Sequence, residues 1–109
     1  MSENISSLRE AIVSGDKNAR AVTASAVDAA EKLNSTLNAF LEIDREGALN
    51  RAGAIDASIK SRGEAKPLAG IPIAIKDNIC VRGMQTSCGS RILGPYHPPY
   101  DATAIKRLL

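Results

Sequence analysis

The residue in this sequence with the clearest chemical potential is Lys76, which ends a short apolar run rich in isoleucine. Five residues without charge, Ile71 to Ile75, come directly before it. Side chains alternate along a β-strand, so the three isoleucines of this run would point to one side and Lys76 to the other. If both faces of such a strand were covered, as inside an α/β sheet, the lysine would lie in apolar surroundings. Desolvation lowers the pKa of a lysine, and a neutral lysine is a base.

A second interpretation of Lys76 involves no chemistry. A lysine at the end of a strand commonly keeps its charged group in water while its aliphatic stem lies on apolar surface. Buried lysines are rare, so the residue pattern on its own favours this second interpretation.

Three blocks of sequence around Lys76 resemble the amidase signature family. They are residues 67–79, PLAGIPIAIKDNI, residues 83–90, GMQTSCGS, and residues 101–103, DAT. Within the family the chain is most similar to the branch formed by the A subunits of glutamyl-tRNA(Gln) amidotransferases, which the run LNAFL at residues 37–41 also resembles. The resemblance covers residues 5–109. It implies the N-terminal part of an α/β fold with a mixed sheet flanked by helices, in which a helical segment precedes the first core strands.

The resemblance also implies a catalytic role for Lys76. Members of the family use a serine nucleophile, a second serine with a cis peptide bond, and a lysine that matches Lys76. This lysine would act as general base and deprotonate the attacking serine through the bridging serine. In the family both serines lie in a Gly/Ser-rich block well downstream, and the 33 residues after Lys76 contain no such block. The nucleophile is therefore expected outside this chain, and the chain by itself is expected to be inactive.

Two polar residues directly after Lys76 have two interpretations. Asn78 lies on the same alternating side as Lys76 and could hold the lysine by a hydrogen bond. Alternatively, Asp77 and Asn78 simply satisfy the backbone of a loop.

The same ambiguity applies to the hydroxyl residues of the second block. Thr86, Ser87 and Ser90 could support the site as hydrogen-bond donors, or they could be ordinary turn residues. Ser87 and Ser90 are not assigned as nucleophile or bridging serine, because they do not belong to the family's downstream serine block.

The resemblance to this amidotransferase branch implies hydrolysis of glutamine to glutamate and ammonia. The ammonia would convert Glu-tRNA(Gln) to Gln-tRNA(Gln) in a complex with the B and C subunits of the amidotransferase. ATP and magnesium would be used by the B subunit, so no cofactor is expected in this chain. One alternative is a stand-alone amidase of the same family acting on a small amide. Another is a truncated, non-catalytic protein that only binds a partner.

Composition excludes several other classes of protein. The chain has 109 residues and a net charge of +2, which is too small to imply a nucleic-acid partner by itself. No apolar stretch approaches the length of a membrane span, and the first residues do not resemble a targeting signal, so a cytoplasmic location is expected. Cys80 and Cys88 are then expected as free thiols. A metal site is not expected, since His97 is the single histidine.

Hydrophobic periodicity and capping residues predict four helices and two short strands. The first helix is expected from about Ile5 to a stop at Gly15, with a possible capping box at Ser7–Glu10. The second is expected from about Thr23 to Leu33 or slightly beyond. The third is expected after a cap at Asp44, and the fourth after a cap at Asp101. Their apolar stripes are expected at Ala26, Ala30, Leu33 and Leu37 in the second helix, and at Ala48, Ala52, Ile55 and Ile59 in the third. The strands are expected at residues 38–43 and 71–76.

This pattern divides the chain into an N-terminal helical segment, residues 1–66, and a truncated start of the amidase signature core, residues 67–109. The last expected helix stops at Leu108 and Leu109, an apolar pair without a C-capping residue. A domain rarely ends in the middle of such a helix, so the sequence predicts a fragment of a larger protein.

Overall fold

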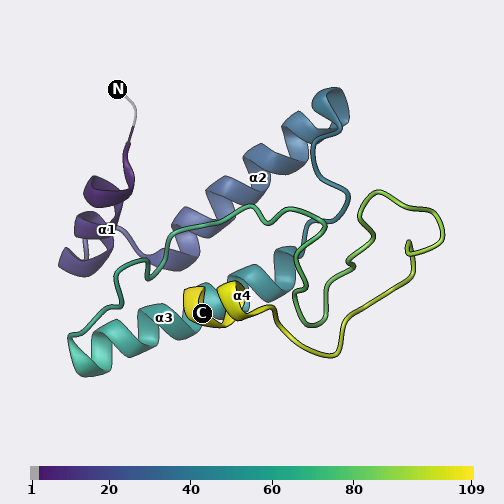
Figure 1. Cartoon of the computed structure of the whole chain (residues 1–109). Helices are drawn as coiled ribbons and strands as arrows, with labels where there is room; N and C mark the ends of the chain where they lie inside the picture. The colour runs from purple at the N-terminus through teal and green to yellow at the C-terminus, as the bar shows by residue number, and fades with distance from the viewer. Residues whose placement is uncertain (1–2) are drawn as a thin grey trace. The chain divides into compact units, whose positions relative to one another are not determined.

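The computed structural model describes residues 3–109. Over this range it contains four α-helices, α1 (Ile5–Ser14), α2 (Ala19–Leu37), α3 (Arg45–Arg62) and α4 (Thr103–Leu108) (Figure 1). The chain forms two compact units, Met1–Pro72 and Ile73–Leu109. The first unit contains α1, α2 and α3, and the second contains α4 and the loops that surround Lys76.

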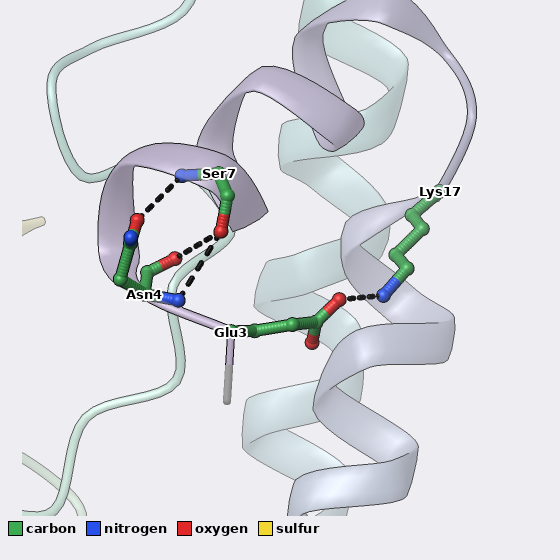
Figure 2. Close-up of polar contacts among 4 residues, drawn as sticks. All are labelled: Glu3, Asn4, Ser7 and Lys17. Atoms are coloured by element: carbon green, nitrogen blue, oxygen red, sulfur yellow. Dashed lines mark hydrogen bonds and ion pairs between the residues drawn. The ribbon is translucent and has the colours of Figure 1, made fainter. Parts of the chain in front are cut away.

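Helix α1 begins with a reciprocal capping box. The side-chain oxygen of Asn4 accepts the backbone N–H of Ser7 at 2.8 Å, and the Ser7 hydroxyl accepts the backbone N–H of Asn4 at 3.2 Å (Figure 2). The capping box expected at Ser7–Glu10 is therefore wrong, because the helix starts earlier and Ser7 lies inside its first turn. Gly15 ends the helix with a φ of 89°, as predicted. Figure 2 also shows the ion pair between Glu3 and Lys17.

Helices α2 and α3 pack against each other as an antiparallel hairpin (Figure 1). Helix α2 starts four residues before the expected Thr23, because Asn18 caps it by accepting the N–H of Ala21 at 2.7 Å. Helix α3 starts as predicted, with the Asp44 carboxylate accepting the N–H of Gly47 at 3.0 Å. Each cap satisfies backbone donors that the first helical turn leaves free.

Neither expected strand forms within residues 3–109. Residues 38–43 instead form a loop that begins at Asn38, which has a φ of 50°. The Asn34 side chain accepts the backbone N–H of Phe40 at 2.8 Å and donates to the Phe40 carbonyl at 3.0 Å. Residues 71–76 have no regular secondary structure. A strand needs a neighbouring strand to satisfy its backbone groups, and the described residues supply none, so this part of the predicted α/β sheet is not observed.

The core of the first unit lies where α1, α2 and α3 meet. Ile12, Ala19 and Ala52 are buried there, and partly buried side chains pack around them, namely Leu8, Val22, Ile55 and Ile59. The stripe predicted for α3 is confirmed at its last three positions. In contrast, Leu33 and Leu37 of the stripe predicted for α2 are 54% and 64% exposed.

The buried face of α2 carries Ala19, Thr23 and Val27 instead. These residues recur every four positions, so they lie along one side of the helix. Alanines lie on all sides of α2, so the prediction of its apolar face depended on Leu33 and Leu37. These two leucines lie on a different side of the helix from Ala19, Thr23 and Val27.

Hydrogen bonds between loops connect parts of the second unit, in which Val81 and Ile105 are buried. The Arg82 N–H donates to the Asp101 carboxylate at 2.7 Å, and the Arg82 guanidinium donates to the Pro99 carbonyl at 2.7 and 2.9 Å. Asp101 was expected to cap α4, but Ala102 occupies that position and no side chain caps this helix. The expectation is wrong, since the helix begins one residue later than a cap at Asp101 requires and the Asp101 carboxylate instead accepts the N–H of Arg82.

Candidate catalytic segment around Lys76

Lys76 lies at the start of a turn, with its side chain exposed in this chain. Its carbonyl oxygen accepts the N–H of Ile79 at 3.0 Å, which closes the turn immediately after it. No hydrogen bond or ion pair of its ammonium to another residue is found in the part of the chain that the structure describes. The ammonium is therefore free to meet a group from outside residues 3–109.

Asp77, the next residue, is the most connected side chain of this segment. One carboxylate oxygen accepts the backbone N–H of Ser87 at 3.1 Å, and the other accepts the Ser87 hydroxyl and, at 3.3 Å, the N–H of Gly89. The backbone carbonyl of Asp77 also accepts the N–H of Cys88 at 3.1 Å. Asp77 thus ties the turn after Lys76 to a second turn ten residues further along the chain.

These contacts favour the ionised form of Asp77. The hydrogen bond from the Ser87 hydroxyl is the largest cause that lowers the pKa of this carboxyl, followed by the bond from the Ser87 N–H. Desolvation raises the pKa by less than either Ser87 contact lowers it, and the N–H groups of Gly89 and Cys88 lower it further. A carboxylate is an acceptor for all of these donors only while it is ionised.

The second turn is tight and has an unusual backbone. Cys88 and Gly89 have φ values of 53° and 71°, and the Ser90 N–H donates to the Ser87 carbonyl at 2.8 Å. Two successive positive φ values are the pattern of a type I′ turn, which only glycine adopts at no steric cost. The Asp77 carboxylate and the Ser87 hydroxyl, which accepts the Gly89 N–H at 3.2 Å, hold this turn closed.

The structure places the expected supporting residues as follows. Ser87 is 3% exposed and is engaged with Asp77. Ser90 accepts the N–H of Ile92 with its hydroxyl at 3.3 Å. Asn78 is exposed in the turn after Lys76. Among the described residues, hydrogen bonds bring Ser87 to Asp77, and they bring none of these three side chains to Lys76.

The interpretation that Asp77 satisfies the backbone of a loop is confirmed, because its carboxylate accepts the N–H groups of Ser87 and Gly89. That these partners lie ten and twelve residues further along the chain was not predicted. A usable signal was present, because an aspartate at a turn commonly accepts backbone N–H groups, and a Ser-Cys-Gly turn with free donors follows at residues 87–89. Thr86 is a further unexpected feature. The residue is 5% exposed, and its hydroxyl oxygen has no hydrogen-bond partner among residues 3–109.

The described residues contain no cluster of three or more histidine, cysteine or acidic side chains that could hold a metal ion. Cys80 and Cys88 are free thiols, as predicted, and the Cys80 thiol lies 3.7 Å from the Tyr100 hydroxyl. The hydrogen bond with Cys80 is the main cause that raises the pKa of Tyr100. No helix within residues 3–109 is both long enough and apolar enough to cross a membrane.

Comparison with known proteins defines the class to which this chain belongs. A model of the amidase family, named Amidase, matches residues 21–109. The chain therefore belongs to the amidase family, and the resemblance seen in the sequence is confirmed. Lys76 and the hydrogen-bonded Asp77 lie within the matched residues.

More particular similarity is to one kind of amidase family member. The A subunit of glutamyl-tRNA(Gln) amidotransferase from Desulforudis audaxviator is 42% identical over 101 residues, which make up 93% of this chain and 20% of that protein. The protein of the same name from Prochlorococcus marinus is 42% identical over 94% of this chain and 21% of its own length. The chain thus spans about a fifth of the length of these curated relatives.

Solved structures share the fold of this chain. One, described as "An unexpected vestigial protein complex reveals the evolutionary origins of an s-triazine catabolic enzyme", matches with a TM-score of 0.89 and 34% identity. The match covers 97% of this chain and 23% of that chain. An inhibitor-bound form of the complex matches with a TM-score of 0.88.

Proposed function

We propose that this chain is the N-terminal portion of the glutamine-hydrolysing A subunit of a glutamyl-tRNA(Gln) amidotransferase. The observation that carries the proposal is the 42% identity to proteins of that name over nearly the whole chain. The reaction would release ammonia from glutamine, and the complex would use it to convert Glu-tRNA(Gln) to Gln-tRNA(Gln). The B and C subunits would be the partners, with ATP and magnesium used by the B subunit in the cytoplasm.

In this reaction Lys76 would act as the general base. A serine supplied by the longer protein would attack the amide carbonyl of glutamine, and its proton would pass through a bridging serine to the lysine nitrogen. The C–N bond would break with return of a proton to the leaving ammonia, and water would then release glutamate from the acyl-serine. The Lys76 side chain is exposed and forms no ion pair with another residue of 3–109, so a group of the longer protein could reach its nitrogen.

The same proposal explains why residues 71–76 form no strand in this chain. We propose that this run pairs as a core strand of a mixed sheet when the rest of the protein is present. Ile73 is 47% exposed in the chain alone, and Ile79 is 37% exposed. Pairing would bury apolar surface at about 25 cal/mol per Å² and would remove Lys76 from bulk water.

A second candidate is a stand-alone amidase acting on another small amide. The observation in its favour is the TM-score of 0.89 with a complex described as revealing the origins of an s-triazine catabolic enzyme. Such an enzyme would use the same lysine but would show no requirement for transfer RNA.

The deciding experiment is a glutaminase assay on the full-length protein, with and without candidate B and C subunits. Release of glutamate and ammonia that rises in their presence, together with formation of Gln-tRNA(Gln), is the expected result. Hydrolysis of small amides with no activity on glutamine would favour the stand-alone amidase. Folding without hydrolysis of any amide would favour a non-catalytic partner-binding protein.

A further inference from the structure

Lys76 and Asp77 are adjacent and of opposite charge, yet no ion pair joins them. The ion pairs Glu3–Lys17, Asp28–Arg45 and Glu31–Arg45 involve other residues. The two oxygens of the Asp77 carboxylate instead accept donors from Ser87 and Gly89. A carboxylate so engaged is a weaker partner for a neighbouring ammonium, because three of its roughly four acceptor sites are already occupied.

The same contacts fix the backbone that carries Lys76. The Lys76 carbonyl is held by the N–H of Ile79, and the Asp77 carbonyl is held by the N–H of Cys88. With the side-chain contacts of Asp77 added, the peptide unit directly after Lys76 is fixed by main-chain and side-chain hydrogen bonds. Ser87, at 3% exposed, is the buried partner in this network, and its neighbours confine its side chain.

We propose that Asp77 is a positioning residue for Lys76. Through Ser87 and the turn at residues 88–89, Asp77 fixes the backbone from which the lysine extends. It also keeps its own carboxylate away from the Lys76 nitrogen, where an ion pair would favour the ammonium form that cannot accept a proton. Lys76 therefore remains available to the serine that it deprotonates. This inference rests on the proposed function of Lys76 as general base.

The test compares the full-length enzyme with four single variants of the loop network, and a double variant and Lys76→Met are measured beside them. Steady-state glutamine hydrolysis and thermal unfolding are measured for each. Asp77→Asn keeps the shape but loses an acceptor, Asp77→Glu keeps the charge but moves it by one methylene, and Ser87→Ala removes the main donor. Asp101→Asn is the matched control, because that carboxylate also holds a backbone N–H in the same unit but is not attached to Lys76.

The expected result is a selective loss of kcat. Small misplacement of a catalytic group can cost on the order of 10²-fold in rate, so a fall in kcat of about 10- to 100-fold is expected for Asp77→Asn and Asp77→Glu, with KM changed by less than about threefold. Ser87→Ala should follow them. The double variant Asp77→Asn/Ser87→Ala should have a kcat no lower than that of the less active of its two single variants, since both changes break the same contact between Asp77 and Ser87. The Asp101→Asn control should keep the wild-type kcat even where its melting temperature falls.

Several outcomes would overturn the inference. Wild-type kcat in Ser87→Ala and Asp77→Glu would show that the contact between Asp77 and Ser87 does not position Lys76. Equal falls in kcat and melting temperature across all four variants would show a role in stability only. If Asp77→Asn does not fold, the milder Ser87→Ala decides the matter. Lys76→Met, assayed beside them, separates the two proposals: if it remains active the proposed function fails, and if it alone is inactive only the positioning role of Asp77 fails.

Discussion

Asp56 on α3 caps the start of α2 by accepting the backbone N–H of Ala19 at 2.6 Å. Its second carboxylate oxygen accepts the N–H of Arg20 at 2.9 Å. Ala19 is fully buried, so its N–H could not turn to water if Asp56 were removed. A single side chain from one helix thereby supplies two of the acceptors that the first turn of the other helix needs.

We expect Asp56→Ala to destabilise the helical unit by about 1–3 kcal/mol, the cost of leaving a buried donor unpaired. Urea unfolding followed by circular dichroism measures this change. Glu31→Gln is a suitable control, because Glu31 forms an exposed ion pair with Arg45 and its loss should have a smaller effect. Equal stability of Asp56→Ala and the wild type would show that the Ala19 N–H finds another acceptor.

Gly70 is a position where any side chain would meet the core. Its φ is 78°, and an added Cβ would lie 2.9 Å from Ile12 Cδ1 and 3.0 Å from Ala19 Cβ. Gly63 has a similar φ of 69° but open space around it. Gly63→Ala therefore reports the backbone strain alone, and Gly70→Ala reports the strain together with overpacking.

We expect Gly63→Ala to cost about 1 kcal/mol and Gly70→Ala to cost roughly 1–3 kcal/mol more, since overpacking a core forces neighbouring side chains to move. Denaturant midpoints of the two variants, measured side by side, give the difference. Identical midpoints would mean that Ile12 moves aside without cost.

Ionisation of Asp77 should make the loop network depend on pH. Hydrogen bonds from Ser87 lower the pKa of Asp77 in the folded state below the ordinary value of about 3.9. A lowered folded-state pKa means that the unfolded chain binds more protons near this pH. The stabilising contribution is therefore present above about pH 3.9 and is lost as the pH falls through the folded-state value.

The measurement is an NMR titration of the Asp77 carboxyl carbon together with the amide protons of Ser87 and Gly89. All three signals should share one midpoint below about 3.9 in the wild type. In Ser87→Ala the midpoint should move back toward the ordinary value, because the largest cause of the shift is gone. A wild-type midpoint at or above the ordinary aspartate value would contradict the hydrogen-bonded arrangement.

Thr86 carries a buried hydroxyl that finds no hydrogen-bond partner in the described part of the chain, so removal of this hydroxyl should not harm the fold. Thr86→Val, which replaces the hydroxyl by a methyl group of similar size, is expected to be neutral or to stabilise by about 1 kcal/mol. Ser87→Ala is the comparison, because the Ser87 hydroxyl is engaged with Asp77 and its loss should lower stability. A clear destabilisation by Thr86→Val would reveal a water or another group bound to this hydroxyl.

Replacement of Lys76 tests the general base directly in the full-length enzyme. We expect each of the variants Lys76→Ala, Lys76→Met and Lys76→Arg to lower the rate of glutamine hydrolysis by on the order of 10² to 10⁴. Alanine and methionine remove the base, and arginine keeps the positive charge but cannot lose its proton at working pH. Lys60→Met, on the exposed end of α3, serves as the control for loss of a lysine. Activity retained by Lys76→Arg would mean that the lysine acts as a fixed positive charge.

The helices were the most predictable part of the fold. The first helix and its stop at Gly15, and the Asp44 cap of α3, follow from residues within one or two turns of each helix end. Such signals are local, so they act before any tertiary contact forms. The start of α2 was placed four residues late because the Asn18 cap lies before the first clearly apolar position.

By itself, the sequence determined where helices form, which lysine is the candidate base, and the membership of the chain in the amidase family. These depend on neighbouring residues or on motifs that are read directly from the chain. The tertiary structure decided which side of α2 is buried, that Asp56 caps a helix 37 residues away, and that Asp77 binds Ser87 instead of Lys76. It also decided that residues 71–76 are not a strand in this chain, because strand formation depends on a partner that no local pattern can supply.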